Sequence, residues 1–133
     1  MSPNKDFLIA ATSLCIGILI YLTCRSNIWA IDFIGLEHLS FRPKFKNNIL
    51  PNLFIYCLPD ALWYLSLLLL QIQFYHRTIL LTRILWWCSV ILPFIIEILQ
   101  AIRFIPGTYD VYDIIFYLLT FIIVLLWKRK KFY

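Results

Sequence analysis

The sequence predicts an all-α, polytopic membrane protein: a four-helix transmembrane bundle with an interfacial segment between the first and second helices. The chain of 133 residues is 62% hydrophobic and only 14% charged, whereas soluble domains are about half apolar and one-quarter charged. Its mean hydropathy is +0.83. Its apolar residues also form four runs near the length of about 20 residues that crosses a bilayer core as a helix. Because the sequence has no repeat or linker, we expect residues 1–133 to form one transmembrane domain.

The first predicted span covers residues 7–24. Lys5 and Asp6 precede it, and Arg25 follows it. A cleaved signal peptide is the alternative, but its apolar region is usually shorter and ends at a small-residue cleavage site that this sequence lacks. We therefore expect this segment to be retained as a membrane helix.

Residues 25–48 form the longest stretch that mixes polar and apolar side chains. Trp29 and Phe33 alternate there with charged residues such as Asp32 and Lys44. A segment of this composition is expected to lie in the membrane interface with its apolar side toward the lipid.

Three further spans are predicted, at residues 59–75, 84–104 and 111–127. The second could begin as early as Ile49, with Pro59 as a kink. The third contains Pro93, which removes one backbone hydrogen bond and leaves a carbonyl near Ser89 in need of another partner. Pro106 and Gly107 predict a turn before the last span.

The basic residues predict that both termini are cytoplasmic. Four spans place the termini on one side, together with seven basic residues: Lys5, Arg77, Arg83, Lys128, Arg129, Lys130 and Lys131. The other side carries five: Arg25, Arg42, Lys44, Lys46 and Arg103. Cytoplasmic loops are the more basic ones in membrane proteins. The net charge of +5 does not indicate nucleic-acid binding, because the basic residues lie at the ends of apolar runs.

Acidic residues within or beside the spans predict a ligand-binding site. An ionised Asp at the centre of a membrane helix costs at least about 2.5–3.5 kcal/mol, so such residues need an explanation. The topology brings four acids to the face opposite the termini, and Gln100 and Arg103 follow Glu97 at helical steps of three. The candidate ligand-binding residues are Asp60, Glu97, Gln100, Arg103, Asp110 and Asp113.

Each acid also has a structural alternative that the sequence leaves open. Asp110 could cap the last helix, with Asp113 at the third helical position. Asp60 follows Pro59 and could start a helix, and Glu97 could be a neutral packing residue or a partner of Arg103. The four cysteines are interpreted as packing residues. No histidine-based metal site, cofactor site or catalytic motif is predicted.

These acids resemble a pattern of the VanZ-like family. The resemblance lies in Glu97-x-x-Gln100 followed by Pro106-Gly107-Thr108-x-Asp110-x-x-Asp113, and in Pro59-Asp60-x-x-Trp63, where the family commonly has His in place of Trp63. It covers roughly residues 57–125. Family members usually carry an Asn and a glycine-rich stretch after the second Asp, and residues 114–123 have neither.

The resemblance implies a bacterial cytoplasmic-membrane protein of the cell envelope. The family's namesake is associated with resistance to teicoplanin, a glycopeptide antibiotic that acts on envelope precursors. The first expected function is binding of an envelope lipid, a lipid-linked precursor or a cation in an acidic, extracytoplasmic pocket. One alternative is a membrane enzyme acting on a lipid phosphate, with Mg²⁺ at the same acids. Another is a structural subunit that assembles with a membrane-protein partner.

Overall fold

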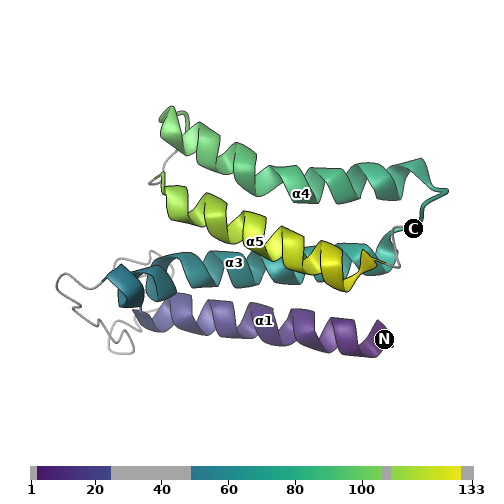
Figure 1. Cartoon of the computed structure of the whole chain (residues 1–133), viewed down its shortest axis with the longest axis horizontal. Helices are drawn as coiled ribbons and strands as arrows, with labels where there is room; N and C mark the ends of the chain where they lie inside the picture. Colours follow the sequence, from purple (N-terminus) through teal and green to yellow (C-terminus); the bar gives the residue numbers. More distant parts are fainter. Residues whose placement is uncertain (1–2, 25–48, 106–108, 130–133) are drawn as a thin grey trace.

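Four helices make up the computed structural model, which describes residues 3–24, 49–105 and 109–129, with side chains from residues 5 and 55 onward in the first two ranges. They are α1 (Pro3–Cys24), α3 (Ile49–Phe74), α4 (Leu80–Ala101) and α5 (Val111–Trp127), labelled as in Figure 1. The chain reverses direction between successive helices, and both termini lie at the same end (Figure 1). The all-α prediction with four helices is confirmed. The predicted interfacial segment, residues 25–48, lies outside the described residues.

Three of the helices are long and apolar enough to cross a membrane. The qualifying segments are Lys5–Cys24, Ile55–Phe74 and Leu80–Ala101. The fourth helix, α5, is apolar but has 17 residues, which is the lower limit of the usual range for a membrane helix. Length and composition are therefore compatible with the predicted spans, most clearly for the first three.

Three helices begin or end away from the predicted positions. Helix α1 starts at Pro3, before the predicted span that begins at residue 7. Helix α3 starts at Ile49 and continues through Pro59, which is the earlier start that the sequence left open. Helix α4 starts at Leu80, four residues before the predicted Ile84. It does so because the Thr82 hydroxyl donates to the carbonyls of His76 and Ile79 and accepts from the N–H of His76, which forms the turn from which α4 begins.

At its other end α4 stops at Ala101, before the predicted Phe104. Arg103 has φ 58°, in the left-handed region, and its N–H donates to the Gln100 carbonyl at 2.9 Å. The N–H of Phe104 donates to the Leu99 carbonyl, also at 2.9 Å. This pair of bonds is the Schellman motif, which normally has glycine at the left-handed position. This ending was not predicted from the sequence, because an arginine occupies the position where glycine usually marks the motif.

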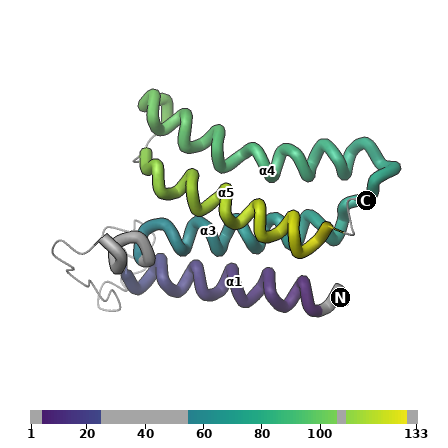
Figure 2. The backbone as a smooth tube through the Cα atoms, viewed as in Figure 1, coloured from purple at the N-terminus to yellow at the C-terminus, as the bar shows by residue number. Residues whose placement is uncertain are grey.

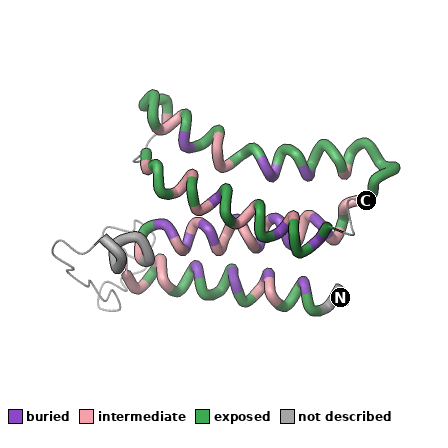
Figure 3. Tube along the Cα trace, viewed as in Figure 1, coloured by how far each residue is buried: buried purple, intermediate pink, exposed green. Residues whose placement is uncertain are grey.

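Helix α3 is the centre of the bundle. It packs most extensively against α1 and also contacts α5 and α4 (Figure 2). Among the described residues, it carries more buried positions than its neighbours (Figure 3). The buried core draws on all four helices: Ala10 of α1; Tyr64, Leu68, Leu69 and Ile72 of α3; Trp86 and Val90 of α4; and Tyr117 and Val124 of α5. Large apolar side chains elsewhere remain exposed, as expected for helices that contact lipid.

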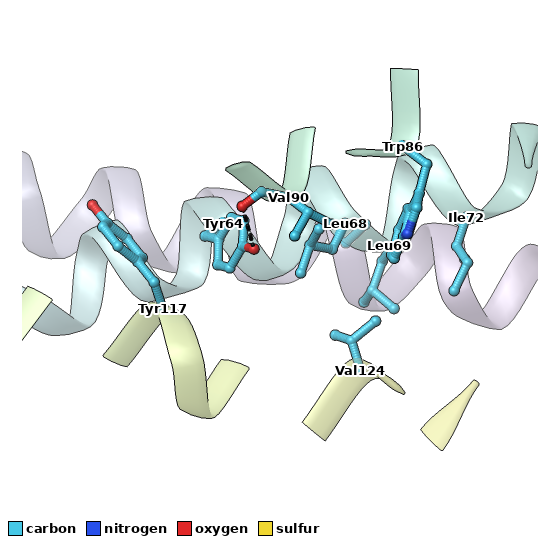
Figure 4. Packing of buried hydrophobic residues seen from close by; sticks show 9 residues of the cluster. Tyr64, Leu68, Leu69, Ile72, Trp86, Val90, Tyr117 and Val124 are labelled. Carbon is cyan, nitrogen blue, oxygen red and sulfur yellow. Dashed lines mark hydrogen bonds between the residues drawn. The ribbon is translucent and has the colours of Figure 1, made fainter. Parts of the chain in front are cut away.

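Aromatic side chains connect α3 to α4 and α5 near the middle of the core. The Tyr64 hydroxyl donates to the carbonyl of Val90 at 3.1 Å (Figure 4). The Tyr64 ring lies edge-on to Tyr117 and Phe94, with centroids 5.4 and 6.4 Å apart, an arrangement that aromatic pairs favour. Val90 lies three residues before Pro93. Tyr64 thus supplies a partner for the Val90 carbonyl in the turn that the proline interrupts. This carbonyl is next to that of Ser89, near which the sequence predicted a carbonyl in need of a partner.

The contact between α1 and α3 depends on a glycine. A Cβ at Gly17 would lie 2.6 Å from Cδ1 and 2.7 Å from Nε1 of Trp63, and 3.1 Å from the Pro59 carbonyl oxygen. Only glycine leaves room for the indole ring here. Tyr21, one turn further along α1, packs against the same indole with the ring centroids 5.2 Å apart and the rings tilted by 43°. Together these contacts hold α1 beside the middle of α3.

Candidate functional site: an acidic cluster at one end of the bundle

Four carboxylates from three helices meet at the end of the bundle opposite the termini. Asp60 lies well inside α3, so the alternative that it starts a helix is wrong. Glu97 lies on α4, while Asp110 immediately precedes α5 and Asp113 lies in its first turn. Asp60, Asp110 and Asp113 are all close enough to Glu97 for their charges to interact. We call these four residues the acidic cluster. The structure therefore brings together the acids that the predicted topology placed at one face.

Glu97 joins α4 to the start of α5. Its Oε2 accepts a hydrogen bond from the Asp110 N–H at 3.4 Å, although only 4% of the residue is exposed. In a capping box the N-cap N–H is bound by the side chain three residues later, which here would be Asp113. Here Glu97 of α4, instead of Asp113, accepts the hydrogen bond from the N–H of the N-cap residue Asp110. This role of Glu97 was not predicted, because it depends on how α4 and α5 meet.

Asp110 is the N-cap of α5, as one alternative from the sequence predicted. Its Oδ1 accepts from the Tyr112 N–H at 2.9 Å. The side chain thereby satisfies one of the N–H groups that a helix start leaves without an intrahelical partner. This structural role accounts for one member of the acidic cluster without a ligand.

Two uncharged residues that the sequence analysis did not select also belong to this region. Cys57 is 1% exposed, and its thiol is in hydrogen-bonding contact with Asp113. Tyr117 is also buried and lies within electrostatic range of Asp60, Asp113 and Glu97. Helical spacing was the available signal: Cys57 lies three residues before Asp60, and Tyr117 lies four residues after Asp113, so each shares a helix face with an acid.

A small groove on the bundle has one member of the acidic cluster, Asp60, in its lining. It has a volume of about 190 Å³ and runs between α3 and α4, with Tyr117 of α5 in its wall. Asp60, Trp63 and Tyr64 line one side of it, and Pro93 and Ile96 line the other. Its walls are thus largely apolar and aromatic, with one carboxylate. A ligand at Asp60 could enter sideways between the two helices.

The two remaining candidates, Gln100 and Arg103, are placed differently. Gln100 is half-buried in the last turn of α4, three residues after Glu97. Arg103 is exposed and lies beyond the helix end in the left-handed conformation. The predicted stripe along one helix face therefore ends at Gln100. The structure records no ion pair between Glu97 and Arg103 in the part of the chain that it describes.

The described part of the chain contains no cluster of metal ligands. Within residues 3–24, 49–105 and 109–129, no group of three His, Cys, Asp or Glu side chains is placed to hold a metal ion. The Mg²⁺ alternative therefore gains no support from the geometry of the acids. His76 is exposed in the turn after α3, at the opposite end of the bundle, and His38 lies outside the described residues.

Comparisons with models of known protein families, with curated proteins and with solved structures find no match. The likeness to the VanZ-like family therefore rests on the sequence motifs alone. The chemistry and position of the acidic cluster carry the functional argument.

Proposed function

We propose that the protein is a VanZ-like integral membrane protein of the bacterial cytoplasmic membrane, with four spans and cytoplasmic termini. In this proposal the acidic cluster is an extracytoplasmic pocket for the cationic group of an envelope lipid or lipid-linked precursor, or for a small cation. The biological role would be envelope homeostasis or glycopeptide-type antibiotic resistance. The observation that carries the proposal is the convergence of four carboxylates from three apolar helices at one end of the bundle.

The distribution of charge supports this orientation. The described basic residues at the end with the termini are Lys5, Arg77, Arg83, Lys128 and Arg129. At the opposite end, Arg103 is the described basic residue, and it lies beside the four acids. Positive charge favours the cytoplasmic side of a membrane. The acidic cluster would then face the envelope.

The composition of the cluster favours a cationic group. Carboxylates placed close together repel each other, and a bound cation relieves that repulsion. An ammonium group offers three hydrogen-bond donors to carboxylate acceptors, whereas a phosphate would add further negative charge. The groove between α3 and α4 offers apolar walls for part of a lipid and has Asp60 in its lining. An aminated lipid headgroup matches both features.

Native mass spectrometry of the detergent-purified protein tests the proposal by measuring bound lipid and cations. Glu97→Gln and Asp110→Asn remove charge but keep the hydrogen-bond acceptors described above, because Asn caps helices as well as Asp does. We expect both variants to lose a ligand that the wild type retains. Arg83→Gln is the control, because it changes the charge at the opposite end of the bundle.

Identical ligand content in the wild type and both variants would contradict the proposal and leave the acids with their capping roles. A second protein that co-purifies in place of a lipid or cation would instead favour the structural-subunit alternative. The two outcomes are separable, because mass spectrometry reports each bound species by its mass.

A further inference from the structure

A second, larger groove lies at the other end of the bundle, between α4 and α5. Its volume is about 570 Å³, within the range of about 300–1,000 Å³ that small-molecule sites occupy. Its apolar walls are formed by Tyr75, Trp86, Trp87, Phe121, Leu125 and Leu126. The groove shares no residue with the acidic cluster. It is wide enough for a flexible apolar chain.

The polar edge of this groove is Arg129. Arg129 is exposed. It follows the end of α5 and lines the groove together with Leu125 and Leu126. Lys128, the residue before it, is buried, and its Nζ lies 2.5 Å from Oδ1 of Asp6. The positive charge of Lys128 is therefore balanced inside the bundle, and Arg129 is the charged residue among those that line the groove.

The surroundings of the groove carry excess positive charge. Lys5, Arg77, Arg83 and Arg129 are all exposed at this end. The acid described there is Asp6, which is buried with Lys128. An anionic group beside Arg129 would meet positive charge from several elements. Arg129 offers a planar fork of donors that matches phosphate oxygens.

Aromatic side chains shape the groove at the depth where they usually contact headgroups. The rings of Tyr75 and Trp86 pack edge-on with centroids 6.2 Å apart, and Trp86 is 2% exposed, so this wall is fixed by packing. Trp87 is 55% exposed and continues the wall outward. Trp and Tyr are enriched at the membrane–water interface. In the proposed orientation, the Arg129 end of the groove lies at the headgroup level of the cytoplasmic leaflet.

We propose that this groove binds one anionic glycerophospholipid, with an acyl chain along the α4–α5 wall and its phosphate held by Arg129. Both parts of the site are needed for this occupant. A free phosphate would make no use of the apolar wall, whereas the acyl chain of a lipid can pack against it. The positive charge around Arg129 favours a lipid with a net negative headgroup over a zwitterionic one.

The test uses the full chain in detergent with phosphatidylglycerol and phosphatidylcholine of identical acyl chains, and native mass spectrometry counts the retained lipids. We expect the wild type to retain phosphatidylglycerol preferentially. Arg129→Gln should lower that preference about fivefold, the ratio that corresponds to the attraction of one basic residue for an anionic membrane surface. Arg129→Lys should keep most of the preference, and Leu125→Trp, which fills the groove, should lower the retention of both lipids.

Lys5→Gln is the matched control, because it removes the same charge from the same end but from α1, which does not line the groove. An equal loss in Lys5→Gln and Arg129→Gln would overturn the proposal in favour of general surface attraction. Unchanged retention in Arg129→Gln would also overturn it, whatever the effect of Leu125→Trp. Glu97→Gln should leave phosphatidylglycerol retention unchanged, so this test is independent of the acidic cluster.

Discussion

Glu97 has a structural role at the start of α5 and a proposed role in ligand binding. Burying the Glu97 carboxylate removes it from water, which costs free energy when the group is ionised. Its hydrogen bond to the Asp110 N–H offsets only part of that cost. A hydrogen bond to a charged group contributes about 1.5–3 kcal/mol, while the neighbouring carboxylates oppose ionisation through repulsion. The role of Glu97 in capping α5 and the proposed role in binding a cation therefore predict different effects for different substitutions.

Glu97→Ala should lower the free energy of unfolding by about 1–3 kcal/mol, because it leaves the buried N–H of the α5 cap without its acceptor. Glu97→Gln should cost much less, because the amide oxygen can still accept that bond. Thermal unfolding of both variants in the same detergent measures the difference. Equal losses in the two variants would mean that the charge of Glu97, rather than its hydrogen bond, stabilises the turn between α4 and α5.

The residues of the site were only partly predictable from the sequence. The four acids could be found because charge within an apolar run is conspicuous, and the alternation of helices places them at one end. Cys57 and Tyr117 are ordinary residues for an apolar helix. Helical spacing alone places Tyr117 beside Asp113, but only the packing of α3 against α5 brings Cys57 to Asp113. The bond from Asp110 to Glu97 likewise depends on the relative rotation of two helices, which hydrophobic runs do not encode.

At the scale of elements, the existence of the helices was more predictable than their ends. A run of apolar residues identifies a helix, but local hydrogen bonds decide where it begins and ends. Thr82 starts α4 earlier than the position of Arg83 suggested. A Schellman motif ends it at Ala101 without the glycine that usually marks one.

Arg103→Gly should therefore stabilise the protein by about 1 kcal/mol, because the left-handed conformation costs a residue with a Cβ about 1–2 kcal/mol and costs glycine almost nothing. Arg103→Ala is the control, since it removes the same charge and keeps the Cβ. Chemical denaturation of the two variants gives the comparison. A loss of stability in both variants would mean that the Arg103 side chain makes a stabilising contact that outweighs the strain.

At the scale of the whole molecule, the arrangement separates two kinds of charge. The described acids other than Asp6 gather at one end with Arg103, and the remaining described basic residues gather at the other. Helix α3 holds this arrangement together by contacting each of the other three helices. The packing of α1 against α3, through Gly17 and Trp63, leaves the first turns of α1 beside the end of α5, where Asp6 contacts Lys128.

That junction is the buried ion pair between Asp6 and Lys128, whose side chains are 12% and 9% exposed. Removing one partner of a buried pair leaves a buried charge uncompensated, which typically costs about 3–5 kcal/mol. Lys128→Met should therefore lower the free energy of unfolding by an amount of this order. The methionine keeps an apolar chain of similar length, so most of the loss would come from the charge left on Asp6.

The double variant Asp6→Asn with Lys128→Met should recover most of that stability, because replacing both charges removes the desolvation cost along with the attraction. A double-mutant cycle measured by thermal unfolding isolates the coupling between the two side chains. A coupling near zero would mean that the two ends of the chain fold without contact. A large coupling would mean that Asp6 and Lys128 lie at the same end of the bundle, which agrees with an even number of membrane crossings and not with an odd number.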